Sequence, residues 1–161
     1  MNDFWLPTPK VKFYEALGAV ADERLFDITE TSANVYSSKR DKFYQVVFEP
    51  ETNSINSNDN STYYVGYLGY PAISFLLAND YLPYKSQLAE CLSGVEWKKI
   101  NQKYKNDFTS ALNNEVLSML DLELVNELNI YVDGLSETFN KLSLKKLGST
   151  QVPPKSIQIL S

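Results

Sequence analysis

The sequence predicts a single α+β domain, in which an N-terminal helix and a small antiparallel sheet precede a C-terminal helical half that ends in a long helical hairpin. Two observations lead to this prediction. Segments rich in β-branched and aromatic residues lie before residue 66, whereas apolar residues recur every three or four positions after residue 70. With no repeat or linker in 161 residues, we expect a helix-plus-sheet half (1–70), a helical half (71–148) and a tail (149–161).

The first helix is predicted over residues 9 to about 21. Thr8 carries a hydroxyl that can cap a helix, and Pro9 suits the first helical position because no backbone N–H donor is needed there. Apolar residues follow at intervals of three or four positions. This segment is therefore expected to be an amphipathic helix.

The sheet is predicted to be an antiparallel meander of four or five short strands. Residues 42–49 (KFYQVVFE) alternate most clearly, with Tyr44, Val46 and Phe48 on one face. That apolar face predicts a central strand that is covered on at least one side. The other candidate strands are residues 24–29, 33–37, 54–57 and 62–65, of which the last two are expected to form a hairpin.

Pro71 opens the helical half at a first helical position. The residues after it are apolar on nearly all sides, which indicates a buried helix rather than a surface helix. Residues 84–92 are predicted to form a short second helix that is closed by Gly94. In the tail, Ile157 and Ile159 alternate with polar residues, and this pattern fits either an edge strand or an irregular end.

Two long stretches of helical periodicity occupy residues 97–119 and 124–142. The short connection between them predicts antiparallel neighbours, hence the helical hairpin. Their apolar stripes can pack within the chain or meet the same stripes of a second copy. Because two-fold dimers are the commonest assembly, a homodimer through these C-terminal helices is one expectation.

The composition excludes several classes of site. The chain has no histidine, which removes Ser-His and Cys-His nucleophile pairs and the commonest zinc ligand. One cysteine permits no intramolecular disulfide and is too few for a cysteine-based zinc site. We therefore expect no metal and no cofactor.

The charge and the absence of long apolar runs bear on location and partners. The single cysteine, together with the lack of a secretory signal, favours a soluble, cytoplasmic protein with no membrane segment. The net charge of −5 makes nucleic acid an improbable partner. Residues 86–101 match a helix-turn-helix only in part, because Gly94 lies one residue late and the next helix is too long. The lysines of residues 98–105 are interpreted as a solvated helix face.

Residues 57–84, termed the joint, lead from the predicted sheet into the helices and hold six of the 11 tyrosines. The run of residues 57–61 is interpreted as an Asx-type turn rather than a calcium loop, because it has a single carboxylate. Gly66 and Gly69 are interpreted as a bend before a helix rather than a phosphate cradle, since no Lys-Ser/Thr pair follows. The candidate binding residues are Asn58, Asp59, Asn60, Tyr64, Tyr67, Gly69 and Tyr70.

Tyrosine offers an apolar body with a polar tip, which suits both ligand pockets and protein interfaces. The leading hypothesis is a non-catalytic binding or protein-interaction module that uses the joint. The alternative is a histidine-free enzyme or a small-molecule-binding protein with its pocket at the joint, where acid–base chemistry would need Asp59, Asp80 or a tyrosine. A DNA-binding regulator is the third hypothesis. The sequence identifies neither substrate nor partner, and no catalytic residue.

Overall fold

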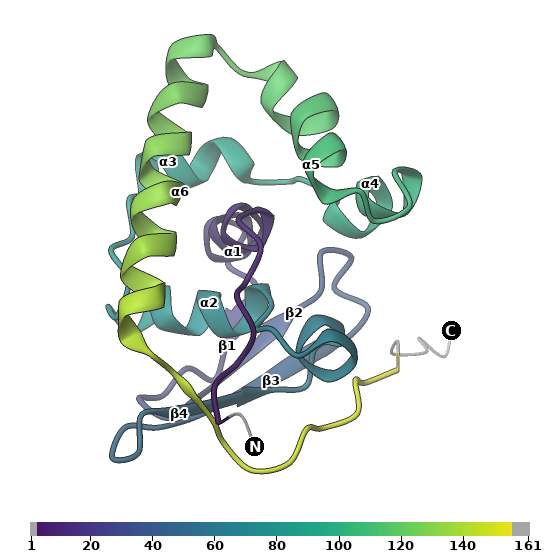
Figure 1. The fold of residues 1–161 in the computed structure, drawn as a ribbon. Helices are drawn as coiled ribbons and strands as arrows, with labels where there is room; N and C mark the ends of the chain where they lie inside the picture. The colour runs from purple at the N-terminus through teal and green to yellow at the C-terminus, as the bar shows by residue number, and fades with distance from the viewer. Residues whose placement is uncertain (1–2, 156–161) are drawn as a thin grey trace.

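The structure, a computed structural model, describes residues 3–155. A five-stranded sheet carries α2 (Tyr70–Ala78) on one face, and α1 (Val11–Ala21) packs on α2 (Figure 1). The long α6 (Leu122–Leu142) contacts α1 and α3 (Ser86–Ala89). The predicted α+β architecture, with an N-terminal helix, a sheet and a helical second half, is confirmed.

The sheet keeps its strands in chain order. They are β1 (Leu25–Phe26), β2 (Ser32–Tyr36), β3 (Phe43–Glu49), β4 (Ser54–Ser57) and β5 (Lys145–Lys146). The middle position of β3 and its alternation are both confirmed. Tyr44, Val46 and Phe48 are buried, whereas Gln45 and Val47 on the opposite face are exposed. Along β3, one face of the sheet is therefore covered by helices and the other faces solvent, whereas all four residues of β4 are buried.

The fifth strand departs from the predicted meander. The first three pairings are antiparallel, but β5 pairs with β4 in parallel and comes from residues expected in the helical half. α6 ends at its C-cap, Ser143, whose φ of +48° is left-handed. Asn53 Nδ2 holds this end of the helix by donating to the carbonyls of Leu142 and Ser143 at 2.7 and 3.2 Å. The sheet is consequently mixed.

The predicted strand at residues 62–65 is wrong. These residues belong to η1 (Ser61–Val65), a short π-helix that Gly66 ends with a φ of +100°. The backbone N–H of Tyr63 donates to the carbonyl of Asp59 at 3.0 Å, which coils the chain directly after β4. Local hydrogen bonding thus overrides the β propensity of the Thr-Tyr-Tyr-Val run.

The first arm of the predicted hairpin is not one helix. It is divided into α4 (Trp97–Lys103), α5 (Phe108–Ala111), the π-helix η3 (Leu112–Val116) and the 3-10 turn η4 (Leu117–Met119). Lys105 and Asn106 have φ values of +52° and +64°, which no α-helix accommodates. Asp107 then starts α5 by accepting a hydrogen bond from the N–H of Ser110. The helical spacing of the apolar residues persists although the helix does not.

Smaller differences concern element ends. Thr8 does not cap α1, whose N-cap position is Lys10; the Thr8 hydroxyl instead donates to the carbonyl of Leu68 at 2.9 Å. Asp27, with a φ of +51°, ends β1 early. The short helix expected before Gly94 is present as α3 and the 3-10 turn η2 (Glu90–Leu92).

The alternating pair Ile157 and Ile159 lies outside the described residues. Between residues 3 and 155, no helix combines the length and the apolar character that crossing a membrane requires.

The two faces of α6 give the first prediction. Leu135 is fully buried in the core, whereas Ile130 on the same helix is 73% exposed. Leu135→Ala should lower the free energy of unfolding by about 2–5 kcal/mol, because it leaves a cavity, while Ile130→Ala should change it by about 0.5 kcal/mol or less. Urea unfolding of both variants measures the difference. Equal losses would contradict the orientation of α6 described above.

Candidate functional site

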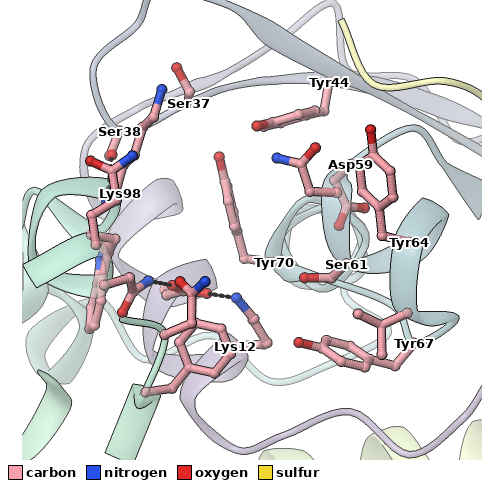
Figure 2. A pocket seen from close by; sticks show the side chains of 18 of the residues that line it. Lys12, Ser37, Ser38, Tyr44, Asp59, Ser61, Tyr64, Tyr67, Tyr70 and Lys98 are labelled. Atoms are coloured by element: carbon pink, nitrogen blue, oxygen red, sulfur yellow. Dashed lines mark hydrogen bonds and ion pairs between the residues drawn. The ribbon is translucent and has the colours of Figure 1, made fainter. Parts of the chain in front are cut away.

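A pocket of about 530 Å³ opens where the joint meets α1, the β2–β3 turn and α4. Figure 2 shows Tyr70 in the centre of this pocket, with Ser38 and Lys98 on one side and Tyr64 and Tyr67 on the opposite side. The joint therefore forms one wall of a concave site. We call this site the joint pocket.

The structure places five of the seven candidate residues on this pocket. They are Asp59, Asn60, Tyr64, Tyr67 and Tyr70. The other two, Asn58 and Gly69, do not line it. The side-chain oxygen of Asn58 accepts a hydrogen bond from the Gln45 N–H at 2.8 Å, and Gly69 packs against Asp59.

The tyrosines of the joint do not act as one cluster. Tyr63 stacks edge-on against Tyr64, at 4.8 Å between ring centroids, but does not line the pocket. Tyr81 packs edge-on against Phe48 of β3, and Tyr84 packs against the hydrophobic core. The tyrosine-rich pattern thus combines pocket residues with ordinary packing residues.

Asp59 anchors the turn that enters the pocket wall. Its carboxylate is only 4% exposed. One oxygen accepts hydrogen bonds from the hydroxyls of Ser57 and Thr62 at 2.7 and 2.6 Å, and the other accepts from the Thr62 N–H at 3.3 Å. These bonds form the Asx-type turn that the sequence indicates, and they compensate the buried charge.

Gly69 leaves the space that Asp59 occupies. A Cβ atom at this position would lie 2.2 Å from Asp59 Oδ2 and 3.3 Å from the Ser61 Cβ. The φ of Gly69 is −84°, so its backbone conformation is open to any residue. The requirement for glycine is therefore one of space and not of backbone freedom.

Two tyrosines of the pocket are held in the neutral form. Burial raises the pKa values of Tyr44 and Tyr70 above the ordinary value, and nearby acids add to the effect, although the charge of Arg24 partly offsets it at Tyr70. The two rings meet edge-on at 6.2 Å, and the Tyr70 hydroxyl donates to the Tyr36 carbonyl at 3.3 Å. They supply a rigid aromatic surface with hydrogen-bonding tips.

Sequence reasoning missed a buried polar network beside the pocket. Lys12 Nζ lies 3.0 Å from Glu15 Oε2, and Asn101 Nδ2 donates to Glu15 Oε1 at 2.8 Å. Lys12 also lies over the Phe108 ring, 4.3 Å from its centroid. A signal was present in the sequence, because Lys12 and Glu15 are the only charged residues of α1 (VKFYEALGAVA).

The interpretation of the lysines of α4 must also be corrected. They were interpreted as a solvated face, but Lys98 is half-buried and lines the joint pocket. Lys99 remains exposed and pairs with Glu96 at 3.6 Å. Arg24 and Lys42, which line the pocket from outside the joint, were not singled out in the sequence at all.

Within residues 3–155, no group of three or more acidic or cysteine side chains could hold a metal ion.

The space at Gly69 gives a second prediction. Gly69→Ala should destabilise the protein by about 1–3 kcal/mol, because the new methyl group displaces Asp59 from its hydrogen bonds. The control is Gly134→Ala in α6, where a Cβ meets nothing within 4 Å and should stabilise the helix by up to about 1 kcal/mol. Thermal or urea unfolding of both variants compares them. A stable Gly69→Ala protein would contradict the close packing of Asp59.

The buried tyrosines give a third prediction. Burial raises the pKa of Tyr14 from 10.0 to about 12, and the pKa values of Tyr44 and Tyr70 are also raised. Because the folded values exceed the unfolded ones, their stabilising contribution is complete below pH 10.0 and is lost as the pH rises through the folded values. Tyrosinate absorbance should therefore develop in at least two stages in the native protein and in one stage in urea. A single native transition near the ordinary tyrosine pKa would refute this.

Comparison with known proteins gives a family for the chain. No curated protein and no solved structure matches it. One family model, described as uncharacterised conserved protein UCP014422, matches residues 5–147, a range that includes every residue lining the joint pocket. Because this match covers most of the 161 residues, the chain belongs to the family described as uncharacterised conserved protein UCP014422.

Proposed function

We propose that this protein binds a small molecule in the joint pocket and does not transform it. The observation that carries the proposal is the pocket itself, whose volume of about 530 Å³ falls within the range of roughly 300–1,000 Å³ usual for ligand sites. Protein interfaces are flatter on average, so a concave site of this size favours a small ligand over a protein partner.

The lining of the pocket supports this proposal. Aromatic side chains reach it from three parts of the chain: Tyr64, Tyr67 and Tyr70 from the joint, Trp97 from α4 and Phe108 from α5. Ligand sites commonly combine such aromatic walls with a few polar groups that fix orientation. A ligand with a flat ring would gain contact with these side chains, and the tyrosine hydroxyls would add hydrogen bonds.

The state of the polar groups favours binding over catalysis. Asp59 accepts three hydrogen bonds from Ser57 and Thr62, so its carboxylate is already committed to the turn. The raised pKa values of Tyr44 and Tyr70 keep their hydroxyls protonated, and a protonated phenol is not a general base. Of the residues that the enzyme hypothesis names, Asp59 and Tyr70 are constrained in this way.

The other hypotheses from the sequence stay predictions. They are a homodimer through the C-terminal helices, a protein partner at the joint and a cytoplasmic location. The DNA-binding alternative is less favoured, because its two helices, α3 and α4, have only four and seven residues.

Two adjacent tyrosines of η1 allow a matched test of the pocket. Both rings take part in the same edge-on contact, but only Tyr64 lines the pocket, and its side chain is 72% exposed. With the neutral fluorescent dye N-phenylnaphthylamine as the probe, Tyr64→Ala should weaken binding about two- to tenfold, because one aromatic contact of about 0.5–1.5 kcal/mol is lost. Fluorescence titration gives the dissociation constants.

Tyr63→Ala is the control. It removes the same Tyr63–Tyr64 contact and should leave the dissociation constant of the dye unchanged. The absence of saturable dye binding to the unmodified protein would refute the proposed function. So would an equal loss of affinity in the two variants, because binding would then not depend on the pocket wall.

A further inference from the structure

The joint pocket carries an excess of positive charge in a chain whose net charge is −5. Its lining holds four cationic side chains, Lys12, Arg24, Lys42 and Lys98, and two carboxylates, Glu15 and Asp59. Glu15 is paired with Lys12, and Asp59 accepts its hydrogen bonds from Ser57 and Thr62. The lining thus holds two more cationic side chains than carboxylates, four against two, and Asp22, which is outside the lining, lies beside Arg24.

Arg24 is the most deeply buried of these cations, with 2% of its surface exposed. Its Nη1 donates to the Tyr36 carbonyl at 3.2 Å, and its Nε lies 3.8 Å from a carboxylate oxygen of Asp22, too far for a hydrogen bond. Within residues 3–155, its Nη2 has no hydrogen-bond partner. Buried charged donors are normally satisfied, so the arrangement around Arg24 is incomplete.

The other oxygen of Asp22 is occupied, since it accepts from the Ser93 hydroxyl and the Gly94 N–H at 2.6 and 2.8 Å. The Arg24 guanidinium faces the ring of Tyr70, 5.5 Å from its centroid. Its positive charge thus lies directly behind the central side chain of the pocket. The field of this charge acts on the cavity across the Tyr70 ring.

Lys42 and Lys98 approach the pocket from different elements, the β2–β3 turn and the first turn of α4. Neither forms a salt bridge with any residue between 3 and 155. Burial lowers the pKa of Lys42, and the charge of Lys98 lowers it further, whereas Asp41 raises it. Two ammonium groups that repel each other across a cavity would both be stabilised by an anion placed between them.

Hydroxyl groups complete this end of the pocket. Figure 2 shows Ser37 and Ser38 beside Lys98, on the side of Tyr70 away from Tyr64 and Tyr67. Ser37 donates to Asp41 at 2.7 Å and is therefore occupied. Ser38 accepts a weak bond from the Lys98 N–H at 3.4 Å, which leaves its own proton free to be donated.

We propose that the ligand of the joint pocket is a small aromatic anion. Its carboxylate, sulfonate or phosphate group lies between Lys42 and Lys98, where the Ser38 hydroxyl can donate to it and the charge of Arg24 supports it from behind. Its ring lies against Tyr64, Tyr67 and Tyr70. This inference rests on the proposed function and adds the charge of the ligand and the direction in which it binds.

Two dyes separate this inference from the proposed function. Anilinonaphthalene sulfonate and N-phenylnaphthylamine share one ring system and differ in the sulfonate group. The unmodified protein should bind the sulfonate dye at least about fivefold more tightly at moderate salt, because it gains charge-assisted hydrogen bonds. In the double variant Lys42→Met/Lys98→Met this preference should disappear, because the charges that favour the sulfonate group are removed.

Lys99→Met is the matched control. It removes a positive charge from the neighbouring position of α4 but lies outside the pocket, so neither dye should be affected. Equal affinity of the unmodified protein for the two dyes, or a preference that survives in the double variant, would overturn the anion inference and leave the proposed function standing. If neither dye binds, both proposals fail.

Discussion

The joint is organised by one buried carboxylate. Asp59 gathers the hydroxyls of Ser57 and Thr62 and the Thr62 N–H, so the last residue of β4 and the first turn of η1 are held by the same side chain. A buried carboxylate is stable only when such donors surround it, and this requirement makes the chain coil at once rather than continue as a strand. Gly69, which comes next to Asp59 in space, keeps the start of α2 close to this turn.

The position of the pocket follows from that turn. Because η1 is coiled, Tyr64 lies at the pocket wall, while α2 brings Tyr70 to its centre (Figure 2). The opposite wall is built by α1 and α4, whose buried Lys12, Glu15 and Asn101 are linked to one another. Such a buried ion pair adds little net stability, but loss of one partner would leave a charge uncompensated. The polar network therefore ties the shape of the pocket to the packing of α1.

The sequence predicted those elements whose pattern is decided by burial alone. The alternation of β3 and the nearly all-apolar sequence of α2 are examples, because in both elements the apolar residues are the ones that the core buries. It failed at residues 62–65, where the hydrogen bonds of Asp59 outweigh β propensity. It also failed at Lys105 and Asn106, since a spacing of three or four residues does not reveal a left-handed break.

In the candidate site, too, the sequence indicated some residues and missed others. Local composition drew attention to the joint and to five residues that line the pocket. The cations Arg24, Lys42 and Lys98 come from three separate segments, and only the folded arrangement brings them to one cavity. No local pattern distinguishes Lys98, at the pocket, from its exposed neighbour Lys99.

The parallel pairing of β5 bears on how the protein is made. Residues 54–57 form an edge of the sheet until residues 145–146 arrive, and Asn56 then donates to the Leu147 carbonyl, 91 positions further along the chain. During synthesis on the ribosome, the N-terminal segments emerge first and display an incomplete β edge. That edge is a template for pairing with other nascent chains until the C-terminal segment covers it. The sheet is therefore complete only once residues 145–146 are available, and chains truncated before residue 145 keep the edge that invites aggregation.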